Sequence, residues 1–69
     1  MPLTMAIAGE RNLIRKVGGS HEVRRHLKNL GFSAGEGVTV VSDIGNNLIV
    51  HIREDRIAIS REMAGKIMI

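Results

Sequence analysis

The strongest constraint on this chain is the segment Leu48–Ile52, in which large apolar residues occupy every second position. Leucine, valine and isoleucine stand at its first, third and fifth positions, which is the pattern of a β-strand with one buried face. Two further β-rich segments, Val38–Val41 and Arg56–Ile59, flank it across the turn residues Asp43–Asn47 and Glu54–Asp55. Runs so closely spaced predict an antiparallel meander of three strands.

Shorter elements are predicted around this meander. Residues 12–17 form a strand candidate that ends at Gly18–Gly19, and residues 66–69 form a closing strand. Residues 3–10 predict an extended lead-in followed by a turn, and residues 60–64 predict one helical turn with a serine cap. The total is five short strands.

The main helix is predicted to begin after Ser20, whose hydroxyl can cap the first turn. Its apolar positions recur with helical spacing at Val23, Leu27 and Leu30. Gly31 suits the left-handed residue that follows a helix, and Phe32 then lies where it can contact Leu27, as in a Schellman motif. The helix is therefore inserted after the first strand candidate and ends at Gly31.

Strands with apolar faces cannot stay open in a chain of 69 residues, which has room for only one small core. Closure into a small barrel removes exposed strand edges. We therefore expect a mainly β fold, a partly open barrel of about five strands with one inserted helix, and a single domain over residues 1–69.

Composition excludes several functional classes. The chain has no cysteine, so it has no disulfide, thiolate zinc site or thiol nucleophile, and a reducing cytoplasm suits it best. Its start lacks a signal peptide, and no apolar run is long enough to span a bilayer. The net charge of +3 suggests nucleic acid, but the only aromatic residue, Phe32, cannot form a stacking platform for single strands.

Residues for catalysis or tight metal binding are sparse. His21 and His26 are five positions apart, which places them off a common helix face. The ordinary interpretation is exposed histidines, and the alternative is a weak divalent-metal site of His21 or His51 with Glu22. No serine stands in a nucleophile elbow, and Gly18–Gly19 lacks the spacing and lysine of a phosphate-binding loop. We expect a protein that is not an enzyme and requires no cofactor.

The most concentrated charge is the cluster Arg24, Arg25 and Lys28 on the predicted helix. One interpretation is the solvated face of an amphipathic helix. The other is a docking surface for an acidic partner protein, because clustered charge accelerates and orients association.

The order of several segments resembles the bacterial ferrous iron transport protein A (FeoA) family. The resemblance rests on Gly19, on the run Leu27–Gly35 and on the valines at 38, 40 and 41. The opening residues 2–4 and 9–10 and the ending 56–69 resemble short members from Firmicutes. The match covers essentially the whole chain.

This resemblance implies an SH3-like barrel and a cytoplasmic, non-enzymatic accessory protein of ferrous iron uptake. It also implies a partner, the Feo membrane transporter with its GTP-binding domain, which would hold the protein at the inner membrane face without insertion. Similar barrels occur in iron-dependent repressors, which is why transition-metal binding, including Fe²⁺, is attached to the family.

Together, the residues and the resemblance predict contacts through Arg24, Arg25 and Lys28 and through an apolar groove edged by Phe32 and Ile44. The alternative is a metal-responsive or nucleic-acid-binding small barrel, although we expect no nucleic acid partner. The closing segment 66–69 is expected to be an exposed edge strand, compatible with a weak homo-oligomer.

Overall fold

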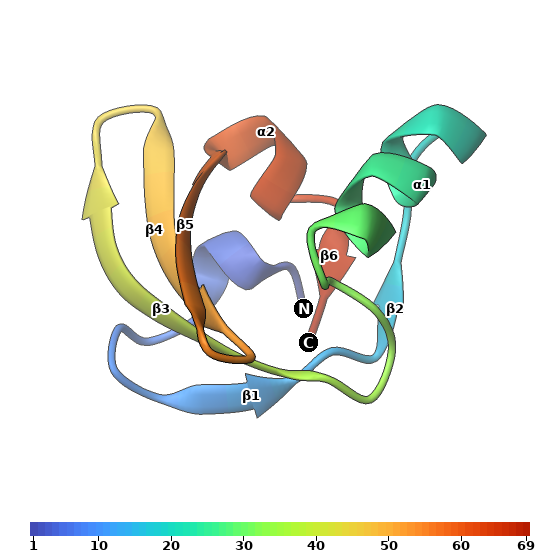
Figure 1. The fold of residues 1–69 in the computed structure, drawn as a ribbon. Coiled ribbons are helices and arrows are strands. Elements are labelled where there is room, and N and C mark those ends of the chain that lie inside the picture. The colour runs from blue at the N-terminus through green and yellow to red at the C-terminus, as the bar shows by residue number, and fades with distance from the viewer.

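The computed structural model describes residues 1–69 and has an antiparallel four-stranded sheet as its largest element (Figure 1). The strand order in this sheet is β1-β3-β4-β5. The strands span β1 Arg11–Leu13, β3 Gly37–Ile44, β4 Asn47–Ile52 and β5 Asp55–Ser60. The predicted meander is confirmed, and its strands are longer than the sequence runs that predicted them.

The second sheet joins β2 (Lys16–Val17) to β6 (Ile67–Met68) in antiparallel fashion. The prediction of one strand over 12–17 is therefore wrong, because the chain changes partner between Ile14 and Arg15. The Ile14 N–H donates to the Glu36 carbonyl at 2.9 Å, whereas the Arg15 N–H donates to the Met68 carbonyl at 2.7 Å. The structure accordingly has six strands in two open sheets, where the sequence predicted five.

The N-terminal segment lies against the free side of β6. Pro2 forms an isolated bridge to Met68, and the Ile69 N–H donates to the Met1 carbonyl at 2.8 Å. In return the Met1 amino group donates to the Ile69 oxygen at 3.0 Å. The expectation that residues 66–69 form an exposed edge strand is therefore wrong, since Met68 has a partner on both sides.

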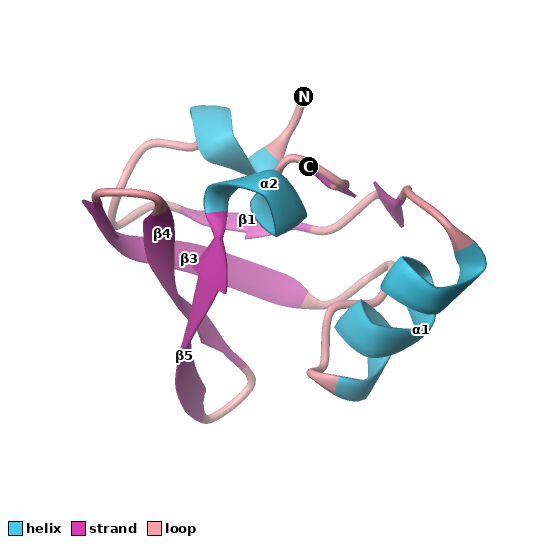
Figure 2. Ribbon diagram, turned by 90° about the horizontal axis from the view of Figure 1, so that it is seen from above, coloured by secondary structure: helices cyan, strands magenta, loops and turns pink.

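Two helices and one short 3₁₀ turn cover the sheets (Figure 2). The 3₁₀ turn η1 (Leu3–Met5) replaces the expected extended lead-in, because burying Leu3 folds the chain back into a Met5 N–H to Pro2 carbonyl bond. Helix α2 (Arg61–Ala64) begins at Ser60, as predicted, with the Ser60 hydroxyl accepting from the Met63 N–H.

Helix α1 (His21–Asn29) ends as the sequence predicts. Gly31 has φ +107°, a left-handed conformation that glycine adopts without steric cost. The Phe32 N–H donates to the Leu27 carbonyl and the Gly31 N–H to the Lys28 carbonyl, both at 2.9 Å. These are the two bonds of a Schellman motif. Leu27 and Phe32 are both buried in the core.

The core is one cluster of twelve buried apolar side chains drawn from both sheets and both helices. The predicted inward face of β4 is confirmed, because Leu48, Val50 and Ile52 are at most 2% exposed. The turn into β5 is centred one residue earlier than predicted, on Arg53–Glu54, with Arg53 at φ +56°. A β-bulge at Val41 shifts the pairing of β3 with β4.

Leu27 and Leu30 provide a test of this packing on one helix end. Leu27→Ala should lower the free energy of unfolding by about 2–5 kcal/mol, because it leaves a cavity in the core. Leu27 is 0% exposed, whereas Leu30 is 38% exposed, so Leu30→Ala should cost much less. Urea unfolding followed by circular dichroism measures both; equal losses would contradict the assignment of Leu27 to the core.

Candidate functional site

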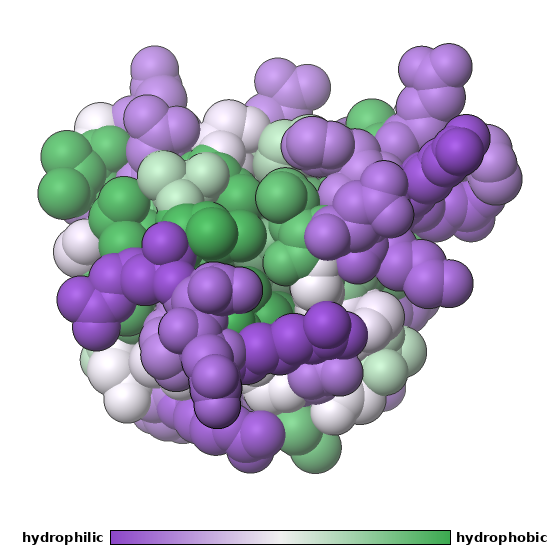
Figure 3. All heavy atoms as spheres, viewed as in Figure 1, coloured by the Kyte–Doolittle hydropathy of each residue, from purple (hydrophilic) through white to green (hydrophobic).

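The candidate site is the outer surface of α1 together with a groove beneath it. Ser20 positions the start of this helix, since its hydroxyl accepts from the Val23 N–H at 3.2 Å. Val23 and Leu27 face the core, which leaves the other side of the helix to solvent. Hydrophilic side chains gather over α1 in the space-filling view (Figure 3).

Three cations of this surface have no acidic partner. Arg24, Arg25 and Lys28 are exposed, and together with His21 they line a shallow depression of about 450 Å³. The structure has two ion pairs, Glu36 with Arg53 and Asp43 with Arg61, and neither includes a residue of α1. The predicted basic cluster is thus brought together on one face, and its charge is available to a partner. We call these three residues the α1 basic face.

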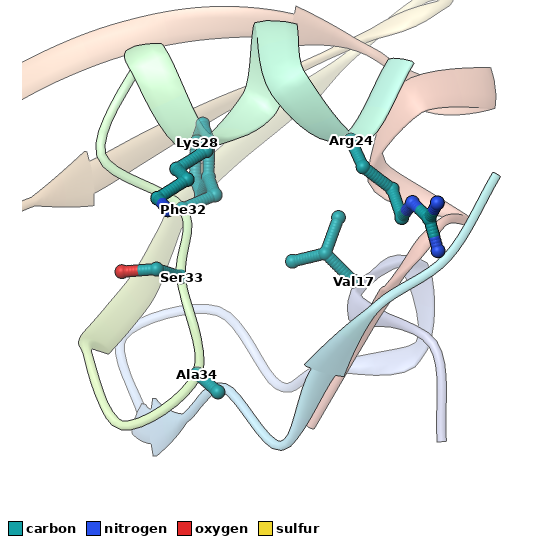
Figure 4. Close-up of a pocket in the computed structure, with 6 residues that line it drawn as sticks. All are labelled: Val17, Arg24, Lys28, Phe32, Ser33 and Ala34. Carbon is teal, nitrogen blue, oxygen red and sulfur yellow. The ribbon is translucent and has the colours of Figure 1, made fainter. Parts of the chain in front are cut away.

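A groove of about 230 Å³ adjoins the α1 basic face (Figure 4). In Figure 4 Arg24 and Lys28 reach down from α1, and Val17 of β2 points up toward the helix. Its lining residues are Val17, Arg24, Lys28, Phe32, Ser33 and Ala34. The groove therefore combines an apolar floor with two cations at its upper side.

Phe32 lies in this groove, but the second predicted edge residue does not. Phe32 is only 1% exposed, so it forms part of the groove wall rather than a protruding contact. Ile44 is 64% exposed at the end of β3 and is absent from the groove lining. The β3–β4 hairpin that carries Ile44 lies on the opposite side of the molecule from α1 in both ribbon views (Figures 1 and 2). A groove edged by both Phe32 and Ile44 is therefore not formed.

Val17, Ser33 and Ala34 were not predicted to belong to the site. Ser33 and Ala34 closely follow the end of the helix, so the glycine at position 31, which predicts that end, also indicates that they lie near α1. Val17 reaches the site only because β2 pairs with β6, in which Val17 lies opposite Ile67, 50 residues further along the chain. No local pattern in the sequence indicates that pairing.

The candidate metal ligands are spread over two elements. His21 and Glu22 are neighbours on the first turn of α1, whereas His51 is exposed on β4, paired across the sheet with Thr39 and Arg56. No three His, Asp or Glu side chains gather in a group that could hold a metal ion. The fold therefore does not bring His21, Glu22 and His51 into one group.

These features define a class, a small SH3-like β domain with an unpaired basic helix face. A family model for the FeoA domain matches residues 1–69, so the chain belongs to the FeoA family. Members are described as ferrous iron transport or iron uptake regulatory proteins. The predicted family and its mainly β, SH3-like fold are confirmed. No helix in the structure has the length and apolar character needed to cross a membrane.

Solved structures support this assignment. FeoA of Stenotrophomonas maltophilia, complexed with zinc and described as a prokaryotic SH3 domain protein, is 26% identical with a TM-score of 0.87, covering 99% of this chain and 87% of that one. FeoA of Chlorobium tepidum is 27% identical with a TM-score of 0.88, covering 99% and 67%. No curated protein matches the chain by sequence.

A manganese-dependent transcriptional repressor has the same fold. It is 14% identical to this chain with a TM-score of 0.86, and the match covers 97% of this chain and 39% of the repressor. At that identity the similarity concerns the fold alone, and one fold commonly serves several functions.

The cap at Ser20 offers a test of how the α1 basic face is held. Ser20→Ala should lower the free energy of unfolding by about 1 kcal/mol, because the Val23 N–H loses its acceptor. Ser42→Ala is the control, since Ser42 is a half-exposed strand residue whose hydroxyl makes no hydrogen bond in the structure. Chemical denaturation of the two variants measures the difference; no difference would contradict the capping role.

Proposed function

We propose that this protein is a single-domain, non-enzymatic accessory protein of ferrous iron uptake that binds the cytoplasmic GTP-binding part of the Feo membrane transporter and modulates transport. It would act in the cytoplasm, held at the inner membrane face through the transporter. The observation that carries the proposal is the α1 basic face, three cations without a carboxylate partner beside an apolar groove. Membership of the FeoA family supplies the link to ferrous iron transport.

The two parts of this site suit different steps of binding. The α1 basic face would attract and orient an acidic partner surface, because clustered charge mainly increases the association rate. The groove would then bury an apolar side chain of the partner against Val17 and Phe32. Apolar anchors in pockets usually supply most of the affinity of an interface.

The first test of this function reverses the charge of the α1 basic face. The triple variant Arg24→Glu, Arg25→Glu and Lys28→Glu should capture the soluble GTP-binding domain of the transporter at least about tenfold less well than the wild type. Added salt should weaken wild-type capture, because screening reduces attraction between exposed charges. Co-purification with and without guanine nucleotide measures both effects.

A second triple variant provides the matched control. Arg11→Glu, Lys16→Glu and Arg56→Glu change the net charge equally at exposed strand positions outside the α1 basic face and the groove lining. This control should keep most of the capture. If the two triple variants lose capture equally, net charge rather than the α1 basic face governs binding. If the wild type captures nothing in any nucleotide state, the proposed partner is wrong.

We also propose that the protein needs no resident cofactor and that any divalent metal binds weakly. The support is the dispersal of His21, Glu22 and His51, none of which belongs to a three-ligand group. The zinc complex of the Stenotrophomonas maltophilia relative shows that a metal can associate with this fold. A metal-responsive role therefore remains the second candidate function.

Calorimetric titration distinguishes these two functions. We expect Zn²⁺, and Fe²⁺ under anaerobic conditions, to bind more weakly than micromolar, because protein zinc sites normally use at least three protein ligands. Binding at micromolar concentration that His21→Ala or His51→Ala abolishes would favour the metal-responsive function. His26→Ala is the matched control, since His26 is an exposed histidine outside the candidate set.

A further inference from the structure

The outer face of the four-stranded sheet carries a row of basic side chains. Strand pairing places Arg11, Thr39, His51 and Arg56 side by side across β1, β3, β4 and β5. Their side chains point away from the core, because the alternate residues of each strand, such as Val50, are buried. Arg11, His51 and Arg56 are exposed.

No acidic side chain projects from this outer face. The two aspartates in these strands, Asp43 and Asp55, pair in register with Leu48 and Ile52 and therefore belong to the inner face, at its rim. The other outward positions of the four strands hold aliphatic residues, glycine, serine and asparagine. The nearest acid before β3, Glu36, is already paired with Arg53 at 3.4 Å.

The local packing holds the charge of Arg11 against the sheet. The Arg11 guanidinium occupies the space where a Cβ atom of residue 37 would lie, so Gly37 makes room for it. The guanidinium therefore lies over Gly37 of β3, while the Arg11 side chain stays exposed. None of the three depressions on the surface is lined by a residue of this face.

Exposed aliphatic side chains mark two ends of the same face. Leu13 at the end of β1 is 56% exposed, and Ile44 at the end of β3 is 64% exposed. A basic face without pockets offers no cavity for a single small anion or for the side-chain anchors of a protein partner. It suits a broad negative surface into which peripheral aliphatic groups can dip.

We propose that the outer face of the four-stranded sheet is a contact surface for a bilayer that contains anionic lipids. The contact is peripheral and electrostatic, and it involves a different side of the molecule from the α1 basic face. It would let the protein lie on the membrane while α1 engages a partner, but it requires no partner itself. A basic group near an anionic bilayer surface increases binding by about fivefold, so Arg11 and Arg56 together contribute about 25-fold.

The test uses the full chain and lipid vesicles without any transporter. Wild-type protein should co-sediment with phosphatidylcholine vesicles containing phosphatidylglycerol, and not with pure phosphatidylcholine vesicles, at low ionic strength. Added salt should release it. The double variant Arg11→Gln and Arg56→Gln should bind the anionic vesicles about 25-fold less tightly.

The matched control is Arg24→Gln and Arg25→Gln, which removes the same charge from α1 and should leave vesicle binding within about twofold. Thermal unfolding of each variant verifies that it is folded. The proposal is overturned if the wild type does not distinguish anionic from neutral vesicles or if the α1 control loses as much binding. It is also overturned if neither the wild type nor the sheet variant binds vesicles, while the sheet variant binds a DNA duplex less tightly than the wild type does. Because no transporter is present, these outcomes leave the proposed partner function to its own test.

Discussion

The bond from the Phe32 N–H to the Leu27 carbonyl fixes how the chain leaves α1 and enters the core. It ends α1 and turns the chain so that Phe32 enters the core beside Leu27, where both are almost fully buried. From there the chain can reach β3 and form the four-stranded sheet. The same turn leaves the opposite side of α1 in solvent and places Ser33 and Ala34 under it, which creates the groove. The candidate site is therefore a direct product of how the helix ends.

Charge is distributed around this core without much internal pairing. Only two ion pairs form, and both are exposed, where such pairs contribute little to stability. The fold therefore depends on the apolar cluster and on backbone hydrogen bonds rather than on ion pairs, and most of the basic residues remain available for contacts outside the molecule. Their separation onto a helix face and a sheet face suggests two different kinds of contact rather than one continuous basic surface.

The candidate site was predictable in part. Arg24, Arg25 and Lys28 were found from helical spacing, because residues three and four positions apart share a helix face. Of the apolar residues that line the groove, the sequence predicts only Phe32. The sequence correctly predicts that Phe32 lies beside the helix. It also predicts Ile44 there, but Ile44 lies at the distant β3–β4 hairpin. It does not indicate that Val17 belongs to the groove. Exposed aliphatic residues carry no signal of their neighbours, so sequence could not decide which of them would meet α1.

The amino-acid sequence by itself determined the elements whose cause is local: the alternating face of β4, the capped start and glycine end of α1, and the serine cap of α2. These depend on side-chain spacing and on hydrogen bonds within a few residues. Tertiary structure alone decided the split between β1 and β2, the covering of β6 by Met1 and Pro2, and the position of Val17 under α1. Each of these depends on which distant backbone groups pair once the core is buried, and that choice leaves no trace in local spacing.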